Sequence, residues 1–483
     1  MMKKLVFTTA LLGVSGLAAA APQPATAAQS AAQSATFKLP RFETTKLPNG
    51  LTVMLMERRE VPLISVRAVV KAGAVNDGAQ AGLANLTGDA ILLGSTKHDK
   101  AAIDEAFDFR GALLSGGSAT EQTTVQANFA KADAAALLPL FAEIVQQPSF
   151  EAAELDKLKN RKVSGLKQAK ESPRQVAGTY YRSMLYGDAP YASPAGGTVN
   201  SLSALKRDDV RGFHGRYFRP DNAAVIVVGD FDPAAMRAQI ETLFGQWRAD
   251  GAAPQRADYG KPLADKPRVW LVDKPDAIET TFVIGGPGIA RNDPDYVPLQ
   301  VLNTVLGGRF TSWLNDELRV NSGLTYGANS AFAPLAQSGI FTMSSFTASA
   351  KTEAALDLAL KTYQRLWAQG KEGGIDKATL DSAKAYVKGQ FPPRFETGEQ
   401  LASLLGDMYA LDVDRAQIDN FMRDVDGLTP AKAKQLVDKH FPRTNLQMVL
   451  VGKADDIRKV AAKYGDVTEL EISADGFKPA AAR

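Results

Sequence analysis

The sequence predicts an α+β protein built from two homologous halves of about 220 residues each. The first observation behind this class is a repeat: FHGRYFRPDNAAVIVVGDFD, which starts at Phe213, resembles LVDKHFPRTNLQMVLVGKAD, which starts at Leu436. Four residue pairs keep the same spacing across the two copies: Leu205 with Leu428, Phe218 with Phe441, Asn222 with Asn445, and Gly229 with Gly452. A constant offset over four anchors indicates a duplicated unit rather than one chance match.

The second observation is that strand and helix patterns alternate in both copies. Apolar or alternating runs predict strands at 51–56, 64–71, 268–272 and 281–284. Helical periodicity predicts helices over 82–93, 101–109, 134–146 and 151–170 in the first copy, and over 297–306, 311–321, 352–369 and 377–388 in the second. Strands followed by helices on one side are typical of α+β layers.

The third observation is an ordinary globular composition, with 45% hydrophobic and 23% charged residues and no cysteine. A chain of this length buries ample core without disulfides, and it offers no thiolate for catalysis or metal binding. The formal charge of +3 becomes +1 (3 − 2) without Lys3 and Lys4. This balance, with no dense basic block, argues against nucleic-acid binding and is compatible with association with another protein.

The first 21 residues have the pattern of a secretory signal peptide: two lysines, an apolar run over 5–17, and small residues up to Ala21. We expect a low-complexity segment over 22–40, a first half over 41–248, a linker over 249–267 and a second half over 268–475. No later stretch reaches about 18 consecutive apolar residues. We therefore expect a periplasmic protein whose mature form has no membrane span.

The segment LGGRFTSWLNDELRVNSGLTYGANSAF, residues 306–332, carries the main candidate site. Leu314 and Leu318 lie four apart, as on one apolar helix face, with Thr311 or Ser312 as N-cap. A left-handed Gly323 would end this helix, which places Arg319 in its last turn and Tyr326 at the start of the next strand. Alternatively, Arg319 pairs with an acid such as Asp316 while Tyr326 packs into a core.

This segment resembles the second-half signature of the insulinase-like (pitrilysin) zinc peptidases. The shared LGG–F–S–L–LR–GL–Y pattern is formed by Leu306, Gly307, Gly308, Phe310, Ser312, Leu314, Leu318, Arg319, Gly323, Leu324 and Tyr326. The resemblance implies two homologous halves that enclose a cleft like a clamshell. It also implies that Tyr326 donates to the developing oxyanion of a peptide under attack and that Arg319 holds the substrate backbone.

The first half departs from the family's zinc motif, HxxEH. After the family's Gly-Leu-Ala lead-in, here Gly82–Ala84, Asn85 and Asp89 stand at the two histidine positions and Gly88 at the general base. The position of the further zinc-ligand Glu is occupied by Gly165, with Leu158 seven positions before it. The first half is therefore expected to be a peptidase-like domain with a degenerate zinc motif, and the second a peptidase-like domain with the Arg/Tyr pair.

Other metal sites are disfavoured by the residues present. Asn85 and Asp89 alone make a weak site for a hard cation such as Ca²⁺. None of the three histidines, His98, His214 and His440, has a second His or Cys at ligand spacing, so we expect solvated or capping roles for them. We expect no cofactor bound by this chain.

One further element is carried over from the family, in which a strand edge after the second helix pairs with the extended substrate. The matching region is 111–119, with Ser115, Gly116 and Gly117 as expected substrate-binding residues. The alternative is a glycine loop or bulge that binds no ligand.

The resemblance favours a zinc-free subunit of a heterodimeric periplasmic peptidase, inactive alone and active with a homologous partner that carries HxxEH and zinc. The expected substrates are unstructured peptides. Two alternatives remain open: a non-catalytic scaffold or peptide-binding protein on the same fold, and an independent enzyme with a novel metal site.

Overall fold

The computed structural model describes residues 37–368 and 374–479. Residues from Phe37 onward form one compact unit. The predicted signal peptide over 1–21 and residues 22–36 of the predicted low-complexity segment lie outside the described residues. No helix in the described part of the chain has the length and apolar character needed to cross a bilayer.

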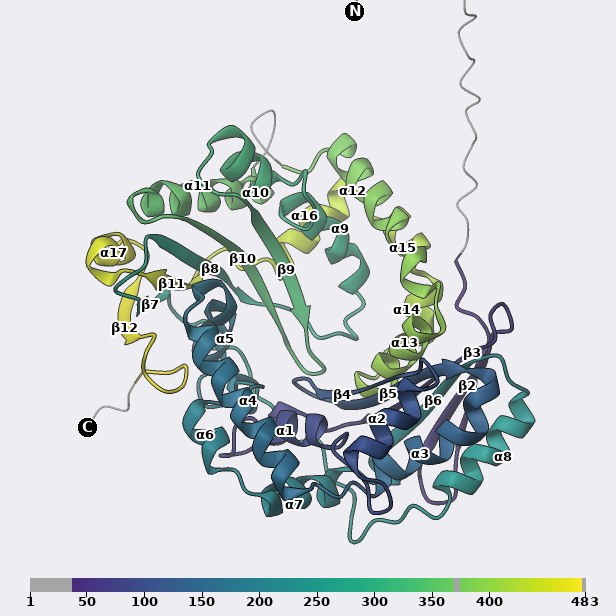
Figure 1. Cartoon of the computed structure of the whole chain (residues 1–483). Helices are drawn as coiled ribbons and strands as arrows, with labels where there is room; N and C mark the ends of the chain where they lie inside the picture. Colours follow the sequence, from purple (N-terminus) through teal and green to yellow (C-terminus); the bar gives the residue numbers. More distant parts are fainter. Residues whose placement is uncertain (1–36, 369–373, 480–483) are drawn as a thin grey trace, which may run out of the picture. The chain divides into compact units, whose positions relative to one another are not determined.

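Two six-stranded sheets organise this unit (Figure 1). The first has the order β1 (Glu43–Lys46), β2 (Thr52–Glu57), β6 (Ala223–Gly229), β3 (Leu63–Val70), β5 (Thr123–Ala130) and β4 (Leu113–Ser118). The second has the order β12 (Asp466–Glu471), β7 (Arg268–Asp273), β11 (Gln447–Gly452), β8 (Glu279–Pro287), β10 (Gly339–Ala348) and β9 (Ala328–Pro334). In the sequence, all strands of the first sheet precede the predicted linker, and all strands of the second sheet follow it.

The internal repeat is visible in the pairing. The last strand of the first copy, β6, is parallel to β2 and antiparallel to β3, and β11 likewise is parallel to β7 and antiparallel to β8. A hairpin continues each sheet to its edge, β5–β4 in the first and β10–β9 in the second. The predicted fold class, two homologous α+β halves, is confirmed; the exact domain limits stay a prediction.

Helices cover the sheets. Those of the first half are α1 (Leu83–Ala90), α2 (Lys100–Asp108), α3 (Ala134–Gln146), α4 (Ala152–Lys170), α5 (Pro173–Tyr186), α6 (Val199–Ala204), α7 (Arg207–Tyr217) and α8 (Pro233–Phe244). Those of the second half are α9 (Tyr296–Leu306), α10 (Trp313–Asn315), α11 (Thr352–Gln364), α12 (Lys377–Gly389), α13 (Gly398–Ala410), α14 (Arg415–Asp419), α15 (Phe421–Asp426), α16 (Pro430–His440) and α17 (Ala454–Ala461).

Two of these helices pack against the sheet of the other half. Helix α5 lies against β8 and β11, and α13 lies against β3 and β6 (Figure 1). Gly285 in β8 leaves room for both neighbours, because a Cβ there would lie 2.0 Å from the carbonyl oxygen of Phe341 in β10 and 2.9 Å from the Tyr181 hydroxyl oxygen of α5. With both faces covered in this way, every residue of β6 and of β11 is buried. The exchange joins the halves into one unit.

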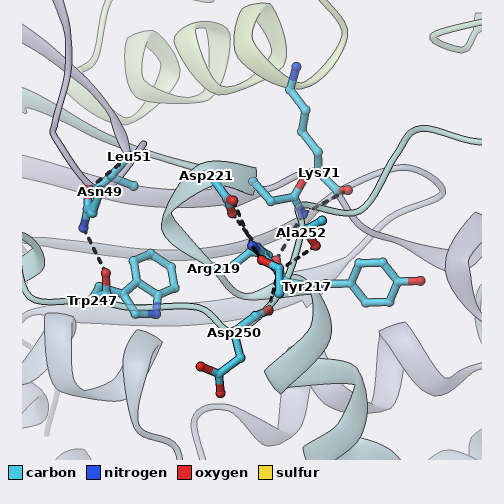
Figure 2. Close-up of polar contacts among 11 residues, drawn as sticks. Asn49, Leu51, Lys71, Tyr217, Arg219, Asp221, Trp247, Asp250 and Ala252 are labelled. Carbon is cyan, nitrogen blue, oxygen red and sulfur yellow. Dashed lines mark hydrogen bonds and ion pairs between the residues drawn. The ribbon is translucent and has the colours of Figure 1, made fainter.

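The start of the linker is held by a buried arginine. The guanidinium of Arg219 donates to the carbonyl oxygens of Asp250 and Ala252 at 3.1 Å, and to that of Gly251 at 2.8 Å (Figure 2). Its remaining face binds the carboxylate of Asp221 at 2.8 Å. This hydrogen bond lowers the pKa of Asp221. Nearby, Asn49 donates to the carbonyl of Trp247, so the chain is fixed as it leaves α8 (Figure 2).

The predicted elements match the structure where periodicity is strong. The helix predicted over 134–146 coincides with α3, and the strands predicted over 51–56, 64–71, 268–272 and 281–284 are present with ends shifted by up to three residues. The helix predicted over 352–369 ends at Gln364 and continues as a short 3₁₀ turn to Trp367; residue 369 lies outside the described residues. Helices α5 and α13 and strands β5 and β10 were missed. The strand predicted to start at Tyr326 is β9, which begins at Ala328.

Candidate functional site

A cavity of about 730 Å³ lies between α5 and the second sheet. One face of α5 forms its roof, through Arg174, Ala177, Gly178, Tyr181 and Arg182. Alternate residues of β10 form its floor: Ile340, Thr342, Ser344 and Phe346. Arg319 and Tyr326 line the same cavity, so the structure brings the predicted pair to one site.

Arg319 lies in the last turn of its helix, as predicted. The helix begins at Trp313 after Ser312 and continues as a π-helical segment over Asp316–Asn321. At its end, the backbone N–H of Ser322 donates to the carbonyl oxygen of Glu317. Gly323 then adopts φ +61°, the left-handed conformation expected there. Buried Leu314 and Leu318 anchor this turn in the core.

The guanidinium of Arg319 stacks over Phe310, with 4.4 Å from its central carbon to the ring centre. Such a contact is worth about 0.5–1 kcal/mol at an exposed site and fixes the plane of the charged group. Arg319 makes no ion pair with any residue in the described part of the chain, so the alternative pairing with Asp316 is wrong. Its donors remain available to a ligand.

Tyr326 is 83% exposed, so the alternative in which it packs into a core is also wrong. It lies in the turn before β9 rather than in the strand itself. Its ring stacks on Phe346 with centroids 6.4 Å apart. The guanidinium of Arg174 also stacks on Phe346, with 3.4 Å from its central carbon to the ring centre. The stack supports the tyrosine ring from one side while the hydroxyl stays accessible.

The degenerate zinc motif has a different environment. The amide oxygen of Asn85 accepts a hydrogen bond of 2.6 Å from the ammonium of Lys162 on α4, and the carboxylate of Asp89 forms an ion pair with the same ammonium. Lys162 lies on one face of α4 with Leu158 and Gly165. A lysine side chain therefore bridges the two positions at which the family has histidine ligands.

The other two motif positions lack side chains, for different reasons. At Gly88 a Cβ would lie 3.0 Å from the carbonyl carbon of Gly117 and 3.0 Å from the Thr123 methyl, so α1 packs against the backbone of β4. At Gly165 a Cβ would meet no atom within 4 Å. With an ammonium between Asn85 and Asp89 and no carboxylate at 88 or 165, these residues do not fit a catalytic zinc ion.

The N-terminus of α1 is capped from within the fold. The carboxylate of Asp77 accepts hydrogen bonds of 2.8 Å from the backbone N–H groups of Gly82 and Ala84. Burial raises the pKa of Asp77 to about 7 despite these bonds. Gly82 itself has φ +91°, which suits glycine. The helix that carries the degenerate motif is thus rigidly held at its start.

Ser115, Gly116 and Gly117 lie in β4, which is the edge strand of the first sheet. Their backbone approaches α1: a Cβ at Gly116 would lie 2.8 Å from the carbonyl oxygen of Gly88. None of the three is among the described residues that line the cavity containing Arg319 and Tyr326. Their role in binding substrate stays a prediction.

The expectation of solvated or capping histidines is wrong for two of the three. His214 is enclosed between Phe150 and Phe218, and burial lowers its pKa to about 4. His440 contacts Asp295, with 2.8 Å from its Nε2 to a carboxylate oxygen. His98, on the surface, contacts Glu143 at 3.0 Å.

Asp293, Asp295 and His440 are close enough together to hold a metal ion. This group was not predicted from the sequence, because only a second His or Cys near each histidine was considered. The ammonium of Lys439 already lies 2.7 Å from the Asp295 oxygen that contacts His440. A positive charge at that oxygen opposes a second cation, so this cluster is accounted for as an ion-pair network.

Similar proteins agree with this architecture. Residues 52–199 match the family "Insulinase (Peptidase family M16)" and residues 204–387 match "Peptidase M16 inactive domain". An uncharacterized zinc protease of Mycobacterium leprae is 27% identical over 82% of this chain and 89% of its own length, and one of Bacillus subtilis is 22% identical over 81% and 94%.

Solved structures give the same result. A peptidase M16 inactive domain from Pseudomonas fluorescens has a TM-score of 0.79 at 27% identity, covering 86% of this chain and 98% of its own. A protease from Helicobacter pylori has a TM-score of 0.76 at 20% identity, covering 86% and 100%, which supports the fold alone. This chain therefore belongs to the insulinase family of peptidases, family M16.

Proposed function

We propose that this chain is the non-zinc-binding subunit of a periplasmic, heterodimeric zinc peptidase that cleaves unstructured peptides. A homologous partner with an intact HxxEH motif would hold the zinc ion and activate water. The observation that carries the proposal is a contrast within the chain. Arg319 and Tyr326 line an open cavity, whereas the polar groups at the zinc-motif positions are already bound to Lys162. The periplasmic address rests on the signal-like pattern of residues 1–21.

The roles of the two residues follow from their environments. The exposed hydroxyl of Tyr326 can donate a hydrogen bond to the oxygen that becomes negative when water attacks a peptide carbonyl. Arg319, oriented by Phe310, can donate several N–H groups to backbone carbonyls of an extended peptide. Neither residue activates water, so the chain alone is expected to be inactive.

Tyr326→Phe tests this assignment in a complex reconstituted from this chain and its HxxEH partner. Removing one oxyanion donor typically lowers turnover by about 10²–10³-fold, so we expect a loss of that size with zinc content unchanged. Tyr386→Phe is the matched control, because Tyr386 is also exposed, at 41%, but does not line the cavity.

Three outcomes would contradict the proposal. Turnover of the Tyr326→Phe complex within a few-fold of wild type would exclude the oxyanion role. Stoichiometric zinc together with peptide cleavage by the purified lone chain would identify an independent enzyme. Peptide binding without any cleavage by the complex would favour the scaffold or peptide-binding alternative.

A further inference from the structure

The cavity that contains Arg319 and Tyr326 is unusually rich in arginine. Four arginines are among the described residues that line it, Arg174, Arg182, Arg309 and Arg319, and no aspartate or glutamate is. This feature is separate from the Arg/Tyr pair, since Arg174, Arg182 and Arg309 are not part of that pair. It bears on which peptides the cavity can accept.

The net positive charge that the arginines present to the cavity depends on nearby carboxylates that do not line it. Arg174 pairs with Glu279, with 2.9 Å between their polar atoms. Arg182 lies near Glu121, whose carboxylate accepts hydrogen bonds from the Tyr191 hydroxyl and the Ala336 N–H. Subtracting both carboxylates from the four arginines leaves two positive charges (4 − 2 = 2) facing the cavity.

Arg182 lies on α5 and is partly buried. One guanidinium nitrogen donates to the Thr120 hydroxyl at 2.9 Å, and this is its single hydrogen bond within the described residues. A guanidinium has five N–H donors, and a partly buried one is stabilised by additional acceptors. The neighbouring hydroxyl of Tyr181 is buried without a hydrogen-bond partner among the described residues and lines the same cavity. The hydroxyl of Tyr181 and the remaining N–H donors of Arg182 are thus available to a ligand in the cavity.

Arg309 lies in the segment just before α10, at the part of the lining that also includes Phe310 and Arg319. It donates to the carbonyl and hydroxyl oxygens of Ser382 at 3.3 and 3.1 Å, which are neutral acceptors. In the described part of the chain no carboxylate neutralises Arg309 or Arg319. The positive field therefore extends from the roof to the motif segment.

The floor gives the cavity a length that suits an extended chain. Ile340, Thr342, Ser344 and Phe346 occupy alternate positions of β10, so the floor spans about 20 Å at about 3.3 Å per residue. An extended peptide of about six residues has the same length. Its side chains would pass the arginines of the roof and of the motif segment.

We propose that this cavity selects extended peptides that carry carboxylate groups, with Arg182 and Arg309 as specificity-determining residues. This inference rests on the proposed function for the presence of a peptide, and it adds the chemical class of that peptide. Charge-assisted hydrogen bonds from guanidinium to carboxylate are about twice as strong as neutral ones. A lysine-rich peptide would meet like charge and be rejected.

Binding to the lone chain tests the proposal without a partner or zinc. A fluorescein-labelled Gly/Ser/Ala peptide of about twelve residues, long enough to overhang the floor, is made with glutamates or with glutamines, each with a free or an amidated C-terminus. Fluorescence anisotropy should show about tenfold tighter binding of the glutamate peptide at low salt, decreasing as salt screens the charges. If amidation alone weakens binding, carboxylate selection is supported and the carboxylate is that of the chain end.

Two variants locate the selectivity. Arg182→Gln and Arg309→Gln should each weaken binding of the glutamate peptide about fivefold or more and leave the glutamine peptide unchanged. Arg443→Gln is the control, since Arg443 stacks on Trp367 outside this cavity. Should Arg182→Gln fail to fold, Arg309→Gln, which lies nearer the surface, still decides.

Equal affinity for all four peptide forms, or an equal loss in Arg443→Gln, would overturn carboxylate selection. Such a result leaves the proposed subunit role intact, because that role is tested by turnover of the Tyr326→Phe complex. Conversely, an unchanged turnover in Tyr326→Phe would remove the subunit role and leave the binding preference standing.

Discussion

The surroundings of Asn85 and Asp89 in the first half differ from those of Arg319 and Tyr326 in the second in one respect: whether polar groups have partners inside the protein. Lys162 occupies the space between Asn85 and Asp89 and satisfies both. Arg319 and Tyr326 contact aromatic rings and leave their polar atoms open to a cavity. The first region has the organisation of a structural core element, and the second has that of a binding site.

This difference shows how a lost metal site can be stabilised. If the metal alone were absent, the partly buried carboxylate of Asp89 on α1 would be left without a counter-ion. An ammonium from α4 supplies the positive charge, and glycine replaces the general base at 88 and the third zinc ligand at 165. The comparison can be tested by changing each region and measuring stability.

The largest effect is expected for Gly88→Glu, which restores the family's general base. The new side chain would press on the backbone of Gly117 and Ser118, at 3.0 and 3.1 Å from its Cβ. We expect a loss of about 3 kcal/mol in the free energy of unfolding, measured by urea denaturation. Gly165→Glu is the matched control, because no atom lies within 4 Å of a Cβ there.

The control variant should be neutral or slightly stabilising, since glycine inside a helix costs about 1 kcal/mol relative to better helix formers. Equal stability of the two variants would mean that α1 can move away from β4. In that case the first region is not closed, and the contrast with the cavity fails.

A smaller effect is expected for Lys162→Met, which removes the internal counter-ion. The side chains of Lys162 and Asp89 are 17% and 32% exposed, between the cases of a surface and a buried ion pair. We expect a loss of about 2 kcal/mol, because Asp89 would remain partly buried without a partner. Lys157→Met, which breaks the exposed pair with Glu154 on the same helix, should change stability by less than about 0.5 kcal/mol.

A double variant completes this test. Adding Asp89→Asn to Lys162→Met should recover most of the loss, because the unpaired charge is then absent. No recovery would mean that the lysine acts through its aliphatic stem rather than its charge. Arg319→Gln, by contrast, should leave stability within about 0.5 kcal/mol of wild type.

For the region around Arg319 and Tyr326, the sequence predicted the residues of the site but not the elements that enclose them. The LGG–F–S–L–LR–GL–Y pattern located Arg319, Tyr326 and the left-handed Gly323, since these depend on local geometry. The roof of the cavity was missed because α5 belongs to the first half and packs on the second sheet. Periodicity within one segment carries no information about a partner some hundred residues away.

The first region shows the same limit. Asn85, Gly88, Asp89 and Gly165 could be read as a lost zinc motif from their spacing, but Lys162 could not be assigned to them. Its contact depends on how α4 crosses α1, which is a tertiary property. Strand β10 was missed despite a usable signal, the alternation of the polar Thr342 and Ser344 with the buried Phe341 and Met343.

The last prediction concerns whether water is excluded from the interior around α1. His214 lies on α7, which packs against α1, and its Nε2 contacts the carbonyl oxygen of Val145 at 3.0 Å. Burial lowers the pKa of His214 to about 4 from an ordinary value of 6.5, so the folded state favours the neutral ring. The unfolded chain binds the proton first as pH falls, and stability is therefore full above pH 6.5 and lost toward pH 4.

Between pH 7 and about 5.5, wild type should lose about 1 kcal/mol more stability than His214→Gln, whose amide can keep the donation to Val145. Asp77, whose pKa is raised to about 7, contributes with the opposite sign, but equally in both proteins, so it cancels in the difference. Urea denaturation of both proteins at the two pH values measures this difference in the free energy of unfolding. Parallel pH dependence would mean that His214 is protonated within the fold, which a closed, dry first region does not allow.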